Sequence, residues 1–145
     1  MTLDELKQKW ALDCVIDETD LSGAALRTSN LHSQYVNEAI DIRLKLVKIQ
    51  MDIAKLQVER ARYFRGEMTT MELKEKGWDQ WMYKTLRADI NDMILGSPDM
   101  QTLLARQEYL KIIQYFLDSV LSEIKSRSFN IRNAMDFLRW RSGAN

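Results

Sequence analysis

Apolar residues recur at helical spacing over residues 24–65, a stretch without glycine or proline, and this pattern predicts one long helix. Two apolar series run side by side along it and together form a face wider than a two-stranded seam requires. We therefore expect the helix to pack against more than one neighbour and to end at Gly66. The first series is Ile40, Leu44, Val47, Met51, Ala54, Val58 and Ala61, and the second is Ile42, Leu46, Ile49, Ile53 and Leu56.

A second long helix is predicted over residues 99–141, after the start signal Ser97-Pro98. Apolar residues stand at every seventh position, with others three or four residues further on. This spacing favours coiled-coil packing, so we expect the series to form contacts between subunits; packing within the subunit is the alternative. Polar residues at 125–128 predict a kink or break near residues 126–128. The series is Leu103, Leu110, Ile113, Leu117, Val120, Leu121, Ile124, Ile131, Met135 and Leu138.

Near the start of the chain, residues 3–12 predict a short helix. Thr2 and Glu5 have the spacing of a capping box, in which each residue satisfies a backbone amide at the helix N-terminus. Residues 14–16 are expected to be extended, and Cys14 to be a small buried hydrophobic residue.

The middle of the chain, residues 67–98, has the weakest pattern. We expect one or two helical turns capped by Thr69 or Thr70 and broken at Gly77-Trp78. Residues 81–86 are expected to form a short strand or a helical continuation. Residues 91–96 are expected to pair with such a strand as a small hairpin. An irregular middle segment is the alternative, within a fold that is mainly α.

Composition restricts the class of protein further. The chain has 145 residues, of which 46% are hydrophobic and 29% charged, with one proline and five glycines, which excludes a disordered chain. No stretch is long and apolar enough for a membrane span, and no secretory signal is visible. One cysteine excludes an intrachain disulfide and a multi-cysteine metal site. Phosphate-loop, dinucleotide and nucleophile-elbow motifs are absent, so we expect a protein without catalytic activity, metal or cofactor.

Formal net charge is zero, but basic side chains are concentrated in the two long helical stretches. Residues 27–65 carry eight basic and four acidic side chains, and residues 100–145 carry seven and four. Such segments can bind a polyanion without a basic overall composition. Two helices with solvated basic faces are the alternative.

Basic and aromatic side chains gather at two places. Single-stranded nucleic acid is held by this combination, because cations follow the phosphates and rings stack on bases. Ordinary helix packing uses it too, so a helical adaptor or scaffold protein without nucleic-acid binding is the alternative. The first group is Lys48, Lys55, Arg60, Arg62, Tyr63, Phe64 and Arg65, and the second is Lys125, Arg127, Phe129 and Arg132.

Three short motifs resemble those of the UvsY-type recombination mediators of T-even-like bacteriophages. They are Asp13-x-x-Ile16-Asp17, Tyr63-Phe64-x-Gly66 and Ile124-Lys125-Ser126-Arg127-x-Phe129-x-Ile131-Arg132. The resemblance implies a protein that is not an enzyme and that binds single-stranded DNA as a ring-like hexamer or heptamer. It also implies two protein partners in the cytoplasm of the infected bacterial host, the phage RecA-like recombinase and the phage single-strand-binding protein. In this role the protein loads the recombinase onto DNA that the single-strand-binding protein covers.

The resemblance also implies where DNA is bound. We expect residues 1–98 to form a DNA-binding region and residues 99–145 an oligomerisation region built from the C-terminal helices. The family carries a Lys-x-Arg pair before the aromatic motif, whereas this chain has Val58-Glu59-Arg60, so the arginine is kept and the lysine is lost. In this interpretation arginines 60, 62 and 65 contact phosphates, Tyr63 or Phe64 stacks on bases, and the basic residues of the second group extend the track.

Overall fold

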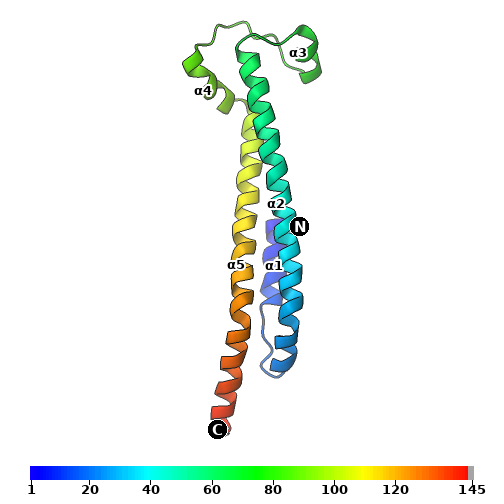
Figure 1. Ribbon diagram of the computed structural model, residues 1–145, viewed down its shortest axis with the longest axis vertical. Coiled ribbons are helices and arrows are strands. Elements are labelled where there is room, and N and C mark those ends of the chain that lie inside the picture. The colour runs from blue at the N-terminus through cyan, green and yellow to red at the C-terminus, as the bar shows by residue number, and fades with distance from the viewer. Residues whose placement is uncertain (144–145) are drawn as a thin grey trace. The chain divides into compact units, whose positions relative to one another are not determined.

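The computed structural model describes residues 1–143, which fold into helices joined by short segments (Figure 1). The described residues include no strand, so the mainly α fold is confirmed and the hairpin predicted within residues 81–96 is wrong. No helix in this part of the chain is long and apolar enough to cross a membrane. In chain order the elements are α1 (Leu3–Asp13), α2 (Leu21–Phe64), α3 (Thr70–Lys76), the 3-10 turn η1 (Arg87–Asp89), α4 (Ile90–Leu95) and α5 (Pro98–Arg141).

The chain divides into two compact units. The α1 unit comprises Met1–Arg43 and the chain from Lys111 onward, and the α3–α4 unit comprises Leu44–Leu110. Both long helices contribute to both units. The predicted DNA-binding region (residues 1–98) and oligomerisation region (residues 99–145, which extend past the described residues) stay predictions.

Helix ends follow the capping signals in the sequence. The capping box at α1 is present: the Glu5 amide donates to Thr2 Oγ1 at 3.2 Å, and the Thr2 amide donates to Glu5 Oε2 at 2.6 Å. After α2, Gly66 has φ +72°, and the amide of Glu67 donates to the carbonyl of Arg62 at 3.0 Å. This Schellman arrangement needs a left-handed residue, which is why glycine ends the helix there.

α3 is capped as the sequence indicated. Its N-cap is Thr69, whose hydroxyl accepts from the amide of Glu72, and it ends at Gly77 with φ +69°. The following segment does not pair as strands because its apolar side chains pack into a core instead. Ile90 and Ile94 are one helical turn apart and both buried, which explains why residues 90–95 form α4.

Six residues of the heptad series are buried by the chain itself. Each is at most 2% exposed, so none can face a neighbouring subunit while this fold is kept. The subunit-contact role predicted for these six is therefore corrected: they form core. For the half-buried Leu103, Leu121 and Leu138 and for the more exposed Met135, that role stays a prediction. The six are Leu110, Ile113, Leu117, Val120, Ile124 and Ile131.

The break predicted near residues 126–128 is also wrong, because α5 is one continuous helix to Arg141. The kink predicted there stays a prediction. Arg127 takes the core position between Ile124 and Ile131 and is only 4% exposed. Its Nη1 donates to the carbonyl of Cys14 at 3.3 Å, at the C-terminal end of α1, where unpaired carbonyls favour a cation. Burial lowers the pKa of Arg127. Cys14 itself is exposed, which corrects the prediction that it is buried.

The α1 unit should lose stability in acid because of Asp13. Its Oδ2 accepts hydrogen bonds from Lys9 Nζ at 2.7 Å and from the Tyr35 hydroxyl at 2.8 Å. Burial raises the pKa of Asp13, but the two hydrogen bonds together with nearby positive charge lower it more, so it lies below its ordinary value. Ionised Asp13 therefore stabilises the folded state. This contribution is complete above the unfolded-state pKa of about 3.9 and is lost as the pH falls through the folded-state pKa. Asp13→Asn should flatten the acid side of a plot of Tm against pH; identical slopes would contradict this.

The two apolar series of α2 differ in burial. Within the α3–α4 unit the second series faces the core, with Leu46 and Ile49 buried. Five consecutive members of the first series, from Leu44 to Val58, are exposed, and their large side chains are 53–67% exposed. We name these exposed positions the α2 stripe: Leu44, Val47, Met51, Ala54 and Val58. Their alternation of four- and three-residue steps is that of a coiled-coil seam, over about 21 Å of helix.

Candidate nucleic-acid interface

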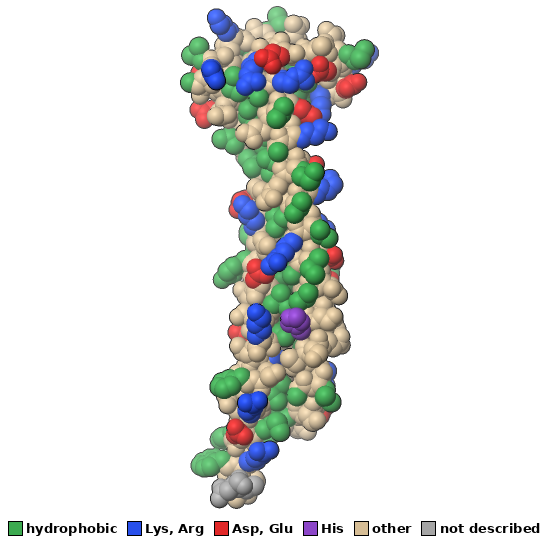
Figure 2. Space-filling model, in the orientation of Figure 1, with side chains coloured by type: hydrophobic (Ala, Val, Ile, Leu, Met, Phe, Trp, Pro, Cys, Tyr) green, Lys and Arg blue, Asp and Glu red, His purple; other side chains and the backbone are tan. Residues whose placement is uncertain are grey.

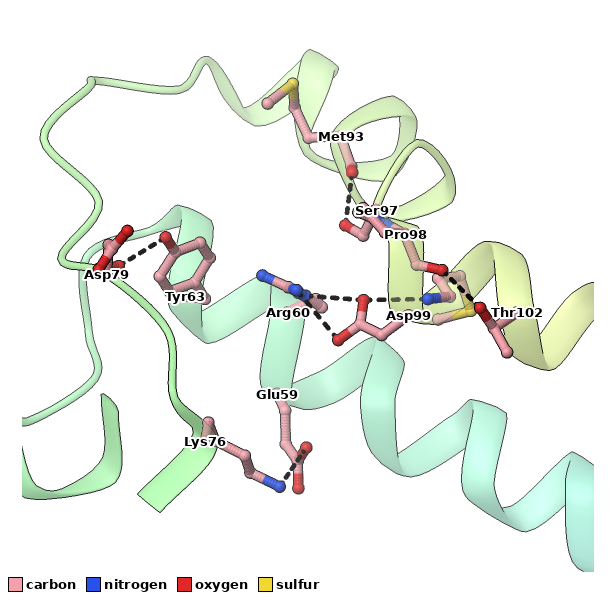
Figure 3. A network of polar contacts seen from close by, with 11 residues as sticks. Glu59, Arg60, Tyr63, Lys76, Asp79, Met93, Ser97, Pro98, Asp99 and Thr102 are labelled. Atoms are coloured by element: carbon pink, nitrogen blue, oxygen red, sulfur yellow. Dashed lines mark hydrogen bonds and ion pairs between the residues drawn. The ribbon is translucent and has the colours of Figure 1, made fainter. Parts of the chain in front are cut away.

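Arg60 is held inside the α3–α4 unit. Its Nε and Nη2 donate to the two carboxylate oxygens of Asp99 at 3.2 and 3.0 Å, and its side chain is only 12% exposed (Figure 3). The guanidinium carbon lies 3.8 Å from the centre of the Trp78 ring, a cation–π distance. Asp99 also accepts the amide of Met100 in the first turn of α5. Arg60 therefore joins α2 to the start of α5 within this unit, and its cation is already paired.

Removing Asp99 should destabilise the protein strongly. In Asp99→Ala the Arg60 guanidinium stays buried without its carboxylate, and we expect the free energy of unfolding to fall by about 3–5 kcal/mol. The matched control is Asp52→Ala, which removes the partner of exposed Lys48 and should cost at most about 1 kcal/mol. Urea denaturation of both variants measures the difference. Equal losses of unfolding free energy in the two variants would show that the Arg60–Asp99 pair contributes no more to stability than the exposed Lys48–Asp52 pair.

Arg62 joins α2 to α3. It pairs with both carboxylate oxygens of Glu72, at 2.7 Å and 3.2 Å, and both side chains are about a third exposed or more. The hydrogen bonds from Arg62 hold the pKa of Glu72 below its ordinary value. A second ion pair between the same helices, Lys76 with Glu59 at 2.8 Å, lies nearby (Figure 3).

The aromatic pair at the end of α2 forms the core of the α3–α4 unit. Tyr63 and Phe64 are 8% and 6% exposed, and both rings pack against Trp81. The Tyr63 hydroxyl donates to the carbonyl of Asp79 at 2.6 Å (Figure 3). Neither ring presents an open face to a base in this conformation. The sequence signal of arginines beside aromatic residues thus marks a packed core here.

Other predicted cations are exposed. On α2, Lys48 pairs with Asp52 at 3.3 Å with its side chain 79% exposed, and Lys55 and Arg65 are exposed as well. Lys48, Lys55 and Arg62 repeat every seven residues, so they share one side of the helix. Lys48, Lys55 and Arg65 therefore leave positive charge of α2 exposed to solvent at several points, as binding along a phosphate backbone requires.

The second predicted group belongs to the α1 unit. Lys125 and Arg132 are exposed on α5, and Arg139, which we did not predict, continues their seven-residue spacing. They line two adjoining hollows of about 300 and 400 Å³ that share Ser128; His32 also lines the smaller. Figure 2 shows basic side chains at intervals over α5, with exposed hydrophobic side chains among them. Arg127, by contrast, is buried, and its hydrogen bond to the carbonyl of Cys14 stabilises the fold.

A third basic group was predicted only in part: Arg65 was among the predicted DNA contacts, whereas Lys84 and Arg87, in the segment with the weakest sequence pattern, were not. An open hollow of about 520 Å³ in the α3–α4 unit is lined by Arg65 together with Tyr83, Lys84 and Arg87. No spacing in the sequence brings these residues together, because the irregular segment before α4 folds back to the end of α2. Within the described residues, no cluster of acidic, histidine and cysteine side chains could hold a metal ion.

Comparison with known proteins identifies the family. The family described as "Recombination, repair and ssDNA binding protein UvsY" matches residues 9–144. The chain belongs to the UvsY family. The recombination protein UvsY of Enterobacteria phage T4 is 24% identical over 143 residues, which covers 99% of both chains. The resemblance seen in three short motifs therefore extends over nearly the whole chain. The family's description links it to recombination, repair and single-stranded DNA binding.

The UvsY fold is also shared. Crystal structures of the bacteriophage T4 recombination mediator protein UvsY superpose on this chain with TM-scores of 0.85 and 0.83, at 22% and 21% identity. The first match covers 98% of each chain, and the second covers 94% of this chain and 98% of the other. The helical arrangement described above is thus that of a UvsY protein.

Proposed function

We propose that this protein is a recombination mediator: it binds single-stranded DNA as a homo-oligomer and promotes loading of a RecA-like recombinase onto DNA covered by single-strand-binding protein. The match to the UvsY family over residues 9–144 is the observation that carries this proposal. Phosphoryl-transfer and nucleophile motifs are absent from the sequence, so the proposed role is non-enzymatic and needs no cofactor. The proposed site of action is the cytoplasm of the infected bacterial host.

The DNA contacts proposed here are a revised set. Exposed Lys48, Lys55 and Arg65 on α2, with Lys125 and Arg132 on α5, contact phosphates. Arg60, Tyr63, Phe64 and Arg127 support the fold, because they are buried or paired. Arg62 is also paired, with Glu72, yet it remains partly exposed beside the track.

Removing two α2 cations should weaken DNA binding in a salt-dependent way. In Lys48→Ala with Lys55→Ala, fewer counterions are released, so the slope of log K against log salt concentration should flatten by about 0.7 per lost phosphate contact. Fluorescence anisotropy with labelled oligo-dT measures both affinity and slope. The control is Lys7→Ala with Lys74→Ala, which removes the same charge from exposed positions on α1 and α3. If both double variants change the slope equally, these lysines are not a DNA track.

The homo-oligomer is proposed to form through the α2 stripe. Its occupant is another copy of this chain, since the resemblance implies a homo-oligomer and most of the α5 heptad is used internally. The stripe offers four large apolar side chains, each more than half exposed, at the 3.5-residue spacing that a partner helix requires. An exposed stripe of this length is otherwise unfavourable, because apolar surface in water is costly. Repeating a weak DNA site around an oligomer then gives avidity without a strong site in each subunit.

The loading role is tested by order of addition. Single-stranded DNA is first covered with fluorescently labelled phage single-strand-binding protein, and the phage recombinase is then added with and without this protein. We expect faster release of the labelled protein and faster recombinase filament assembly when this protein is present. A helical adaptor without nucleic-acid binding would leave both rates unchanged, and that result would contradict the mediator proposal.

A further inference from the structure

The hollow in the α3–α4 unit has the make-up of a nucleotide site. Its lining includes the apolar Phe64 and Ile90, the hydroxyl of Thr85, an aromatic ring and three cations, and includes no acidic residue. Its volume of about 520 Å³ lies in the range of small-molecule sites. Such a mixture suits a ligand that combines a flat apolar group with a phosphate.

The three cations at this hollow are available for a ligand. Arg65, Lys84 and Arg87 are all exposed, and their side chains make no ion pair or hydrogen bond with the other described residues. Arg60 and Arg62, a few residues before, are both paired with carboxylates. The charges of Arg60 and Arg62 are therefore neutralised within the protein, whereas the three cations at the hollow have no carboxylate partner among the described residues.

The aromatic ring at the hollow is open yet anchored. Tyr83 is 73% exposed, unlike the buried Tyr63 and Phe64. It packs against the ring of Trp81 with centroids 5.1 Å apart, and Trp81 packs in turn against Phe64 at 4.9 Å. The indole nitrogen of Trp81 donates to the hydroxyl of Thr85 at 3.0 Å, and this hydrogen bond further stabilises the conformation of residues 81–85. Tyr83 is thus held from one side while most of its surface faces solvent.

We propose that this hollow binds one nucleotide of the single-stranded DNA, with the base stacked on Tyr83 and the flanking phosphates on Arg65, Lys84 and Arg87. This inference rests on the proposed function and names the place where a base is held. Stacking on an exposed ring requires an unpaired base, because the faces of bases in a duplex are already covered. The site therefore provides a preference for single strands that a row of lysines alone does not give. An acidic peptide would use the cations but has no need of the ring.

Two Tyr83 variants separate stacking from folding. Binding of a short labelled oligo-dT by anisotropy should weaken roughly five- to hundredfold in Tyr83→Ala and remain near the native value in Tyr83→Phe, which keeps the ring. Thermal unfolding of both variants should match the native protein, since Tyr83 is exposed. Photocrosslinking of an oligonucleotide containing 4-thiothymidine, followed by mass spectrometry, should label Tyr83 or its neighbours.

The cations are tested beside the ring. The triple change Arg65→Ala, Lys84→Ala and Arg87→Ala should lower affinity and flatten the salt slope more than Lys74→Ala, an exposed lysine of the same unit outside the hollow. If the native protein binds oligo-dT and both the triple variant and Tyr83→Ala bind it equally well, the hollow is not the site and the proposed function stands. If these variants keep DNA binding but lose recombinase loading, the hollow binds a protein and the nucleotide proposal fails. No binding by the native protein overturns the proposed function itself.

Discussion

Leu117→Glu is expected to unfold the protein rather than to release subunits. Leu117 is fully buried in the core of the α1 unit. Removing a buried leucine costs about 2–5 kcal/mol, and the unpaired carboxylate adds several more, against a total stability of about 5–15 kcal/mol for a typical domain. Circular dichroism should show loss of helix or of the cooperative transition, with a large drop in Tm.

Leu117→Met is the matched control, because it nearly conserves volume and should cost less than about 1.5 kcal/mol. Sedimentation of both variants completes the test. A Leu117→Glu protein that keeps its helix content and Tm but sediments as a monomer would contradict the internal role, and it would return the heptad series to the subunit interface.

Val47→Glu combined with Met51→Glu is expected to give folded monomers. Both positions lie on the α2 stripe and are 53% and 67% exposed in the single chain, so the added carboxylates stay hydrated and cost the fold little. At a seam between two helices they would be buried or placed beside apolar partners, which is strongly unfavourable. Analytical ultracentrifugation should show the native oligomer replaced by monomer, with helix content unchanged by circular dichroism.

The control for the α2 stripe is Gln8→Glu with Asn30→Glu, which adds the same two charges at exposed positions of the α1 unit. This pair should leave the sedimentation coefficient unchanged. An intact oligomer in the stripe variant would contradict the proposed seam, and the partly exposed end of α5 around Met135 and Leu138 would then be the surface to examine.

Local signals in the sequence predicted most of the secondary structure. Thr2 with Glu5, Thr69, Gly66 and Gly77 act within a few residues of the ends that they set, so short-range chemistry is enough to place those ends. The two long helices follow equally from the absence of glycine and proline in their interiors.

Burial could not be predicted in the same way. A 3.5-residue period is the same whether the partner helix belongs to the same chain or to another, so the sequence alone could not distinguish core from subunit seam. The structure assigns the α5 heptad largely to the core and leaves one of the two α2 series outside. The predicted break in α5 is absent because Arg127 can occupy a core position when carbonyls at the end of α1 accept its hydrogen bonds.

The candidate site depended on contacts distant in sequence. Arg60 and Tyr63 have the composition of a DNA site, but Asp99 and Asp79 turn them into structural residues. The hollow with Tyr83 depends on Trp81 packing against Phe64, which no local pattern encodes. A tyrosine three-quarters exposed beside free cations is recognisable only once the fold is known.

Equilibrium binding of fluorescently labelled oligo-dT and of duplex DNA of matched length, measured by anisotropy across a salt series, tests single-strand binding most directly. We predict tighter binding of the single strand than of the duplex, with affinity falling steeply, by orders of magnitude, between low and moderate salt. Absence of binding at low salt, or equal affinity for duplex and single strand, would contradict the proposed role as a single-strand-binding recombination mediator.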